Sequence, residues 1–444
     1  FTGGAAQTLR GLEDDTSVTV AGAQTNAGLT LRKQNTSDLD VDLTGGNNID
    51  GGSAPSLTVQ DVANLSLNVL GDGNTSVVQG IQSTFFTGSA ANLQSVNLNP
   101  GSGATLDVDN PILVNQVQDI ADSGSFQLNA DGTGTVNFGT NLDLTSPASP
   151  GGDDAAITDI GIDVGRDVTG QGTDGAVQVG TINVADGQAG DTADAINLAL
   201  TGEGAAEITA LNGAGGNTTS LTVTSEGGDG ENALLNDTSS STLDANFSSV
   251  DNITVEGDQD FALGGTTAVQ LSADGVLDAS EFSGGLTADL SRGNDIAGNS
   301  ASEDLNVDLG SEDATVNVDA AADTGGDDST FEFTFADDIN GDIQIDQFAS
   351  TANTSGGTDT AQGNVDDVLN FSNVFSDVDS YNTTNGTLQD SDGNTLIEFS
   401  DEDDVAGMSD NDLVGTSDQF DGELVLVGIG DTTDLADANF ASIA

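Results

Sequence analysis

The chain lacks cysteine, histidine and tryptophan, and it has little positive charge, with 5 Lys plus Arg against 74 Asp plus Glu in 444 residues. Without cysteine and histidine, disulfides, thiolate chemistry and imidazole chemistry are excluded. Acidic side chains are also too numerous for one catalytic carboxylate pair to stand out. We therefore expect a protein that is not an enzyme.

The formal net charge is -69. The cations are Arg10, Arg32, Lys33, Arg166 and Arg292. Repulsion on this scale opposes folding unless counterions screen it or bound metal neutralises it. Nucleic acid and anionic membranes need a basic face, so we expect neither as a partner. The longest apolar run, residues 424–430, is far below the ~18 residues of a membrane span, so no membrane insertion is expected.

The apolar residues, 35% of the chain, occur in short alternating runs, with 59 glycines and only 5 prolines. This pattern is typical of many short strands joined by turns. The stretch at residues 1–12, "FTGGAAQTLRGL", returns in altered form at residues 86–98, "FTGSAANLQSVNL". We therefore predict a mainly β fold built as a β-solenoid or β-roll, or as β-sandwich-like units, with one small α+β module.

The length predicts about three structural units. A Pro/Gly-rich stretch at residues 146–156 marks the first boundary. The predicted domains are a β-rich repeat domain at 1–145, a small α+β module at 155–235, a β-solenoid-like calcium-binding region at 236–330 and a C-terminal β domain at 331–444.

One helix is expected inside the α+β module, in the run "DTADAINLAL" at residues 191–200. Asp191 or Thr192 would be its N-cap, because a short side-chain oxygen can accept a hydrogen bond from the first turn. Ala193, Ile196 and Leu200 follow at helical spacing.

The run "TGGDDSTFEF" at residues 324–333 is the most informative candidate site. Its phenylalanines alternate with polar residues, so Phe331 and Phe333 should share one buried face. Asp327 and Asp328 follow two glycines, and carboxylates on a tight turn suit Ca²⁺; a solvated acidic turn is the alternative. Degraded copies occur at 227–235 and 292–298. The candidate metal ligands are Asp323, Asp327, Asp328, Asp337, Asp338, Asp229, Glu231 and Asp295.

Residues 320–444 carry the runs "DDINGDIQIDQF", "DDVLNF", "DSDGNTLIEF" and "LVLVGIGDTTDLADANF" in this order. Their order and spacing resemble the C-terminal region of RTX-type, type I secreted proteins, and the upstream composition resembles bacterial surface-layer proteins of that class. The resemblance implies scattered calcium sites and an export signal in the C-terminal strands. The chain begins at Phe1 without a basic-apolar leader, so we expect a trimmed start or export that does not use the N-terminus.

From the charge and the resemblance we expect a secreted, extracellular structural protein at the cell surface, which binds Ca²⁺ and forms a homo-oligomeric lattice or filament. A cell-surface polysaccharide is left open as its anchor. The alternatives are a calcium-stiffened RTX adhesin or binding protein, and a surface glycoprotein of a high-salt archaeon, in which acidity retains hydration. Both alternatives remain open from the residues alone.

Overall fold

A computed structural model of the chain divides it into two compact units, Phe1–Asn246 (unit 1) and Phe247–Ala444 (unit 2). The structure describes residues 6–21, 28–44, 46, 48–49, 56–84, 93–115, 124–145, 157–165, 168–170, 175–185, 195–212, 220–228, 230–235, 250–264, 269, 271, 275–290, 303–318, 329–336, 340–346, 348, 367–401, 412–417, 423–427, 429, 432 and 435–441.

The regular elements named in the described residues of unit 1 are strands. They are β1 (Gln7–Leu12), β2 (Ser17–Ala21), β3 (Leu29–Thr44), β4 (Asn48–Ile49), β5 (Leu57–Leu70), β6 (Thr75–Val78), β7 (Ile81–Thr84), β8 (Ser95–Pro100), β9 (Thr105–Val108), β10 (Ile112–Asn115), β11 (Gly124–Ala130), β12 (Thr135–Asn137), β13 (Leu142–Thr145), β14 (Ile157–Val164), β15 (Val177–Ala185), β16 (Ala195–Gly202), β17 (Ala206–Asn212), β18 (Ser220–Ser225) and β19 (Asn232–Leu234).

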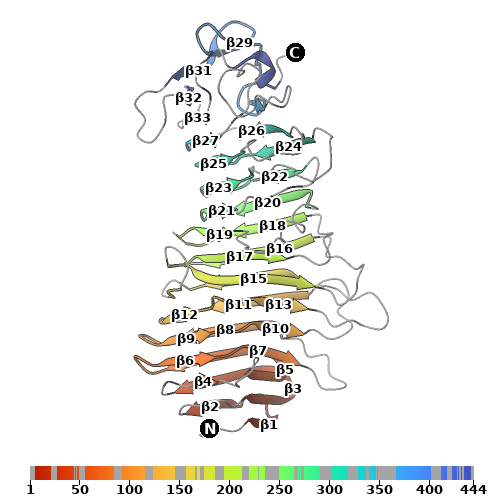
Figure 1. Ribbon diagram of the computed structural model, residues 1–444, viewed down its shortest axis with the longest axis vertical. Helices are drawn as coiled ribbons and strands as arrows, with labels where there is room; N and C mark the ends of the chain where they lie inside the picture. The colour runs from red at the N-terminus through yellow and green to blue at the C-terminus, as the bar shows by residue number, and fades with distance from the viewer. Residues whose placement is uncertain are drawn as a thin grey trace, which may run out of the picture. The chain divides into compact units, whose positions relative to one another are not determined.

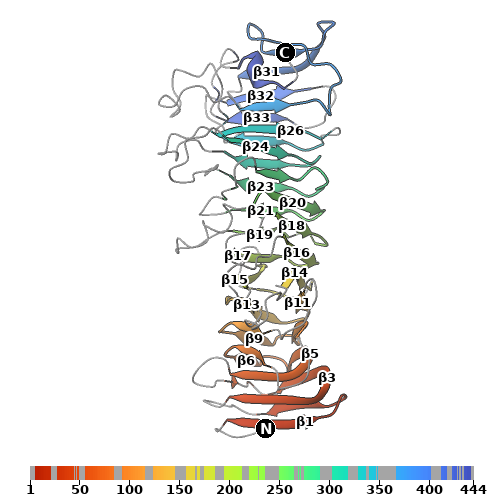
Figure 2. The ribbon, with the colours of Figure 1, turned by 90° about the vertical axis from the view of Figure 1, so that its right-hand side faces the viewer.

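The strands of unit 1 stack in parallel as the coils of a solenoid (Figure 1). One sheet follows the order β1-β3-β5-β7-β10-β13-β15-β17-β19, a second follows β2-β3-β5-β8-β11-β14-β16-β18, and a short third follows β4-β6-β9-β12. The long strands β3 and β5 belong to both of the first two sheets, because each bends between them (Figure 2).

The core of unit 1 consists of apolar columns that run from coil to coil. In one of them Val41, Leu67, Leu98, Ala130 and Val164 occupy successive in-register positions, and all five are buried. Alternation places every second side chain inside, and parallel register aligns those residues between coils. Each fully buried Val or Leu contributes about 1.5–3 kcal/mol, so the columns stabilise the solenoid without disulfides.

Unit 2 begins with the same parallel arrangement, in sheets β20-β22-β24-β26-β28 and β21-β23-β25-β27-β33. Its elements are β20 (Asn252–Gly257), β21 (Phe261–Leu263), β22 (Val276–Asp278), β23 (Leu286–Asp289), β24 (Glu303–Asp308), β25 (Ala314–Asn317), β26 (Ser329–Thr334), β27 (Ile343–Asp346), β28 (Val368–Asn370), β29 (Ser380–Asn382), β30 (Thr387–Gln389), β31 (Thr395–Asp401), β32 (Asp412–Thr416), β33 (Leu424–Val427) and the 3-10 helix η4 (Asp437–Asn439).

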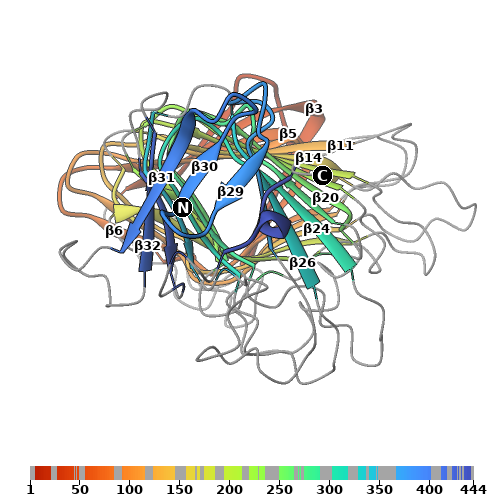
Figure 3. The ribbon, with the colours of Figure 1, turned by 90° about the horizontal axis from the view of Figure 1, so that it is seen from above.

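The C-terminal strands β29–β33 form an antiparallel sheet, which we call the antiparallel cap (Figure 3). Strand β33 pairs in parallel with β27 on one edge and antiparallel with β32 on the other. Phe440 forms a parallel bridge to Leu369 of β28. The two parallel sheets of unit 2 are therefore both continued by residues of the C-terminal region.

The predicted mainly β fold is confirmed. The alternation in "TGGDDSTFEF" is also confirmed, because Phe331, Phe333 and Phe335 are buried on one side of β26 and its continuation. A hairpin at "DSDGN" joins β30 to β31, and Gly393 has a φ of 79° in its turn. A positive φ favours glycine at that position.

The predicted helix is wrong over residues 195–200, which belong to strand β16 between β14 and β18. Ile196 and Leu200 are buried, as a helix would require, but Leu198 between them is buried as well. Spacing of four residues fits both a helix and a strand, and the neighbouring coils select the strand. Asp191, Thr192 and Ala193 lie outside the described residues, and the four domain boundaries stay predictions.

Candidate functional site: polar ladders and an arginine pair

Of the predicted metal ligands, Glu231 is the one within the described part of the chain. It is exposed and directly precedes β19, after a turn in which Gly227 has a φ of 114°. The other candidates lie outside the described residues: Asp323, Asp327, Asp328, Asp337, Asp338, Asp229 and Asp295. Among described residues, no group of three or more His, Cys, Asp or Glu side chains is arranged to hold a metal ion. The calcium prediction therefore stays a prediction.

The described residues do contain ordered polar columns on the outer face of unit 1. Asn68 donates from Nδ2 to the Asp42 carboxylate at 2.9 Å, and Asn99 donates from Nδ2 to the side-chain amide oxygen Oδ1 of Asn68 at 3.1 Å. These residues occupy in-register positions on β3, β5 and β8. We call Asp42, Asn68 and Asn99 the carboxylate–amide ladder.

The chemistry of this ladder depends on strand spacing. Neighbouring strands lie about 4.8 Å apart, so identical outward positions on adjacent coils bring side chains into contact. Two carboxylates at that spacing repel, whereas an amide donates a hydrogen bond to one neighbour and accepts one from the next. The ladder thus places an acidic side chain on a parallel sheet without a cation.

The same pairing recurs elsewhere in both units. In most pairs the amide belongs to the later coil and donates to a carboxylate of the earlier coil; in one, Gln178 of the earlier coil donates to Glu207. The pairs with a later amide are Asp38–Asn64, Asp107–Asn137, Asp143–Asn183, Asp159–Asn197, Asp289–Asn317 and Glu332–Asn370.

Unit 2 departs from this arrangement where Asp278 of β22 and Asp308 of β24 are direct in-register partners. Asp278 accepts hydrogen bonds from the Ser280 backbone N–H and hydroxyl, at 3.1 and 2.6 Å. Burial raises the pKa of the Asp308 carboxyl; a hydrogen bond from Thr334 lowers it, and the charges of Asp278 and Glu332 raise it further. We call Asp278 and Asp308 the acidic column, and it is a place where a cation would be stabilised.

Asp163 in unit 1 experiences a similar environment. Burial raises the pKa of its carboxyl, and the charge of Asp131 raises it further. Asp131 follows β11, whose Asn129 pairs in register with Asp163. Repulsion between outward carboxylates therefore occurs in both units, but direct in-register stacking is seen at the acidic column.

The cationic side chains among the described residues are Arg10, Arg32 and Lys33. Lys33 is buried, with 1% of its surface exposed, and its Nζ donates to the backbone carbonyls of Glu13 and Asp14, each at 2.7 Å. It ties the turn between β1 and β2 to β3. Burial of a lysine is tolerated when its ammonium group is hydrogen-bonded in this way.

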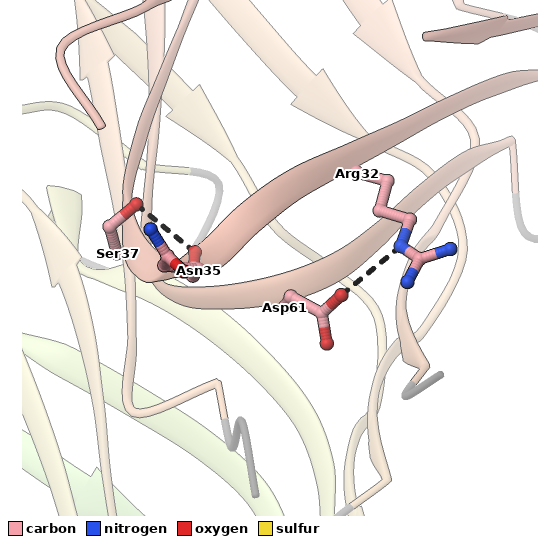
Figure 4. Close-up of polar contacts among 4 residues, drawn as sticks. All are labelled: Arg32, Asn35, Ser37 and Asp61. Carbon is pink, nitrogen blue, oxygen red and sulfur yellow. Dashed lines mark hydrogen bonds and ion pairs between the residues drawn. The ribbon is translucent and has the colours of Figure 1, made fainter. Parts of the chain in front are cut away.

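Arg10 and Arg32 are in-register partners on β1 and β3, and we call them the arginine pair. Arg32 Nε lies 3.2 Å from Asp61 Oδ2 (Figure 4). Asp61 is buried and has a φ of 57°, which is unusual for a residue other than glycine. Figure 4 also shows the Ser37 hydroxyl beside the Asn35 carbonyl oxygen, at the bend of β3 between its two sheets.

The sequence-based interpretation missed both features. The outward asparagines were visible as alternation in runs such as "LSLNVL" and "SVNLNP", but their partners lie 26 and 31 residues earlier in the chain. In the sequence the arginines stand out only as scarce cations. Their pairing depends on the register of β1 with β3, which no local pattern encodes.

In the described part of the chain, no helix has the length and apolar character needed to cross a membrane. No protein-family model, no curated protein and no solved structure matches this chain.

Proposed function

We propose that this protein is an extracellular structural subunit that self-assembles at the cell surface when divalent cations, calcium foremost, offset its acidic charge. The observation that carries the proposal is the imbalance between a formal charge of -69 and the small number of cations, in a chain that nevertheless folds into regular solenoid coils. Strong net charge of one sign keeps copies apart in solution. A cation that binds the acidic side chains would remove that barrier.

The fold supports a structural role through its construction. Stacked coils bury continuous apolar columns and present regular outward columns of polar residues, such as the carboxylate–amide ladder. Extended repeat surfaces of this kind are common in proteins that bind along their length. The C-terminal resemblance to type I secreted proteins supports export and a surface location.

The fit of calcium to the chain depends on oxygen ligands. Carboxylate and amide oxygens are the donors that Ca²⁺ prefers, in sets of six to eight. The described carboxylates form no closed set of metal ligands, so we assign calcium to the predicted acidic turn at Asp327 and Asp328 and to Glu231 with Asp229. Bound calcium would supply charge neutralisation.

The chain's own residues provide the remaining parts of this function. The carboxylate–amide pairs link neighbouring coils without metal, because each carboxylate in them accepts a hydrogen bond from an amide. The coils should therefore keep their parallel register when calcium is removed, while contacts between copies are lost. This separation of folding from assembly distinguishes the proposal from a metal-dependent fold.

Sedimentation velocity and electron microscopy of the full chain test the proposal. We expect large assemblies in millimolar calcium, and their dissociation by chelator at constant ionic strength. Magnesium at the same concentration is the control for charge screening alone. Assembly that persists in chelator would contradict the proposal. Assembly that needs molar monovalent salt would favour the high-salt glycoprotein instead.

A further inference from the structure

Among the described residues, the arginine pair carries the positive charges that solvent can reach. Lys33 is buried and both of its backbone acceptors lie in the turn at residues 13–14, so it cannot reach a partner. Arg10 is exposed and Arg32 is half-buried. Among described residues, Arg10 forms no ion pair, whereas Arg32 reaches Asp61. A strongly acidic chain therefore gathers its accessible described cations at one place.

The arrangement of the arginine pair favours an anionic partner. Arg10 and Arg32 are adjacent in register, so their positions are about 4.8 Å apart on one face of the sheet. Like charges in direct opposition destabilise a sheet. Among the described residues, Asp61 relieves this repulsion at Arg32. A second anion that faces both guanidinium groups would complete the neutralisation, and arginine forms two parallel hydrogen bonds to a carboxylate.

The acidic column has the matching geometry and the opposite sign. Asp278 and Asp308 are also in-register partners on adjacent parallel strands, so they repeat at the same spacing of about 4.8 Å. No described residue of unit 2 is a lysine or arginine. Two carboxylates one strand apart can therefore face two guanidinium groups one strand apart.

We propose that the arginine pair is the docking site for the acidic column of a second copy of this chain. The proposal rests on the self-assembly proposed above and names one of its contacts. The matched repeat of the two pairs favours this occupant over a flexible polyanion, which requires positive charge but no fixed spacing. Because each copy carries both surfaces, the contact is heterologous and can propagate from copy to copy.

The net charge determines when this contact forms. Copies that each carry -69 repel at long range, so the arginine pair acts only after screening or calcium has reduced that repulsion. At physiological ionic strength the screening length is about 8 Å, longer than a direct guanidinium–carboxylate contact. Screening therefore weakens the long-range repulsion more than it weakens the contact itself.

The decisive experiment compares two double variants: Arg10→Gln/Arg32→Gln and Thr75→Glu/Thr105→Glu. Both double variants change the formal charge by the same amount, and Thr75 and Thr105 are an in-register outward pair on β6 and β9, in the sheet that contains neither arginine. We expect the arginine variant to weaken association about 30-fold or more, as loss of one side of an interfacial charge pair does. The threonine variant should assemble almost as the unchanged chain does.

A second set of variants changes the acidic side of the contact. Asp278→Asn with Asp308→Asn should weaken association by a similar factor, although it relieves repulsion inside the fold. A mixture of an Arg10→Asp/Arg32→Asp chain with an Asp278→Arg/Asp308→Arg chain should associate better than either chain alone. Circular dichroism melting checks that each variant is folded, and Arg10→Gln alone, at an exposed position, serves if the double variant does not fold.

The outcomes separate this inference from the proposed function. If the unchanged chain assembles with calcium and the arginine variant assembles equally well, the docking site is overturned and the function stands. If the unchanged chain dimerises through the arginines without needing calcium, the docking site stands and the calcium-dependent function falls. If the chain stays monomeric under all conditions, both fall. An arginine variant that assembles normally but no longer binds an anionic polysaccharide such as heparin overturns the docking site in favour of a polyanion site.

Discussion

Outward columns in unit 1 place amides beside carboxylates, whereas unit 2 contains two aspartates in direct register at the acidic column. The cores differ as well. The unit 1 core is mostly aliphatic, with Phe126 and Phe138 buried in it, while contacts between aromatic rings are concentrated in the C-terminal part of unit 2, as with Phe335 and Phe371 at a centroid distance of 4.6 Å. The difference indicates that the coils of unit 1 continue one repeating pattern, whereas the C-terminal part of unit 2 ends the parallel coils.

The largest expected effect tests the aromatic end of unit 2. Phe335→Ala should destabilise unit 2 by about 3–5 kcal/mol, because it removes a buried ring and its stack with Phe371. Leu67→Ala is the matched change in unit 1, with an expected loss of about 2–5 kcal/mol. Denaturant unfolding, followed by hydrogen exchange in each unit, measures both. If the loss in Phe335→Ala is no larger than 1 kcal/mol (the rough value of an exposed contact), the aromatic stack does not hold the end of the coils.

The next effect concerns the buried lysine of unit 1. Lys33→Met keeps the apolar stem but leaves the carbonyls of Glu13 and Asp14 without their ammonium donor. We expect a loss of about 1–3 kcal/mol, concentrated in β1 and β2. Hydrogen exchange of these strands is the measurement. Unchanged protection there would mean that water replaces the ammonium group at no cost.

A smaller effect sharpens the contrast between the ladder and the acidic column. Asn68→Asp removes the donor to Asp42 and places two carboxylates in register, as in unit 2. We expect a loss of about 1–2 kcal/mol that shrinks as salt is added. Asn68→Ser, which keeps a hydrogen-bond donor, is the control. Equal stability of the Asp and Ser variants at low salt would contradict the role of the amide.

The smallest effect is a gain of stability in unit 2. Asp308→Asn removes a carboxylate whose pKa is raised by burial and by neighbouring charges. We expect the free energy of unfolding to increase by about 0.5 kcal/mol or less, since the group is partly solvated. Because the folded pKa lies above the ordinary 3.8, Asp308 favours folding most below pH 3.8, and this contribution is lost as the pH rises through the folded pKa.

Melting temperatures recorded from neutral pH down through pH 4 measure this effect. The difference between the unchanged chain and Asp308→Asn should narrow on acidification, because protonation then removes the same charge that the substitution removes. A difference that is constant with pH would show that the aspartate acts through packing and not through its charge.

Much of the fold could be predicted from local patterns. Runs such as "LTVTS" and "LVLVGI" alternate or cluster apolar residues over strand length, and they form β18 and β33. Gly393 lies in the turn of the hairpin that joins β30 to β31, where its φ of 79° favours glycine. The run around Ile196 could not be assigned in this way, because its spacing suits a strand and a helix equally, and the pairing with β14 and β18 decides between them.

The candidate site was less accessible to such reasoning. The predicted calcium site around Asp327 rests on composition, and its residues lie outside the described ones. The ladders and the arginine pair combine residues from different coils, so composition alone does not group them. A search for polar residues repeated at coil spacing would have found Asn68 and Asn99, because both occupy outward positions of strands that pair in register.

By itself, the sequence determined the strand period, the side of each strand that is apolar, and the sign and size of the net charge. These are local or additive properties. The tertiary structure alone decided which outward residues meet, as when Asn68 reaches Asp42 across 26 residues, or when Arg10 lies beside Arg32. The reason is that register between coils depends on the length and path of every intervening turn, and a shift of one residue would exchange the inner and outer faces.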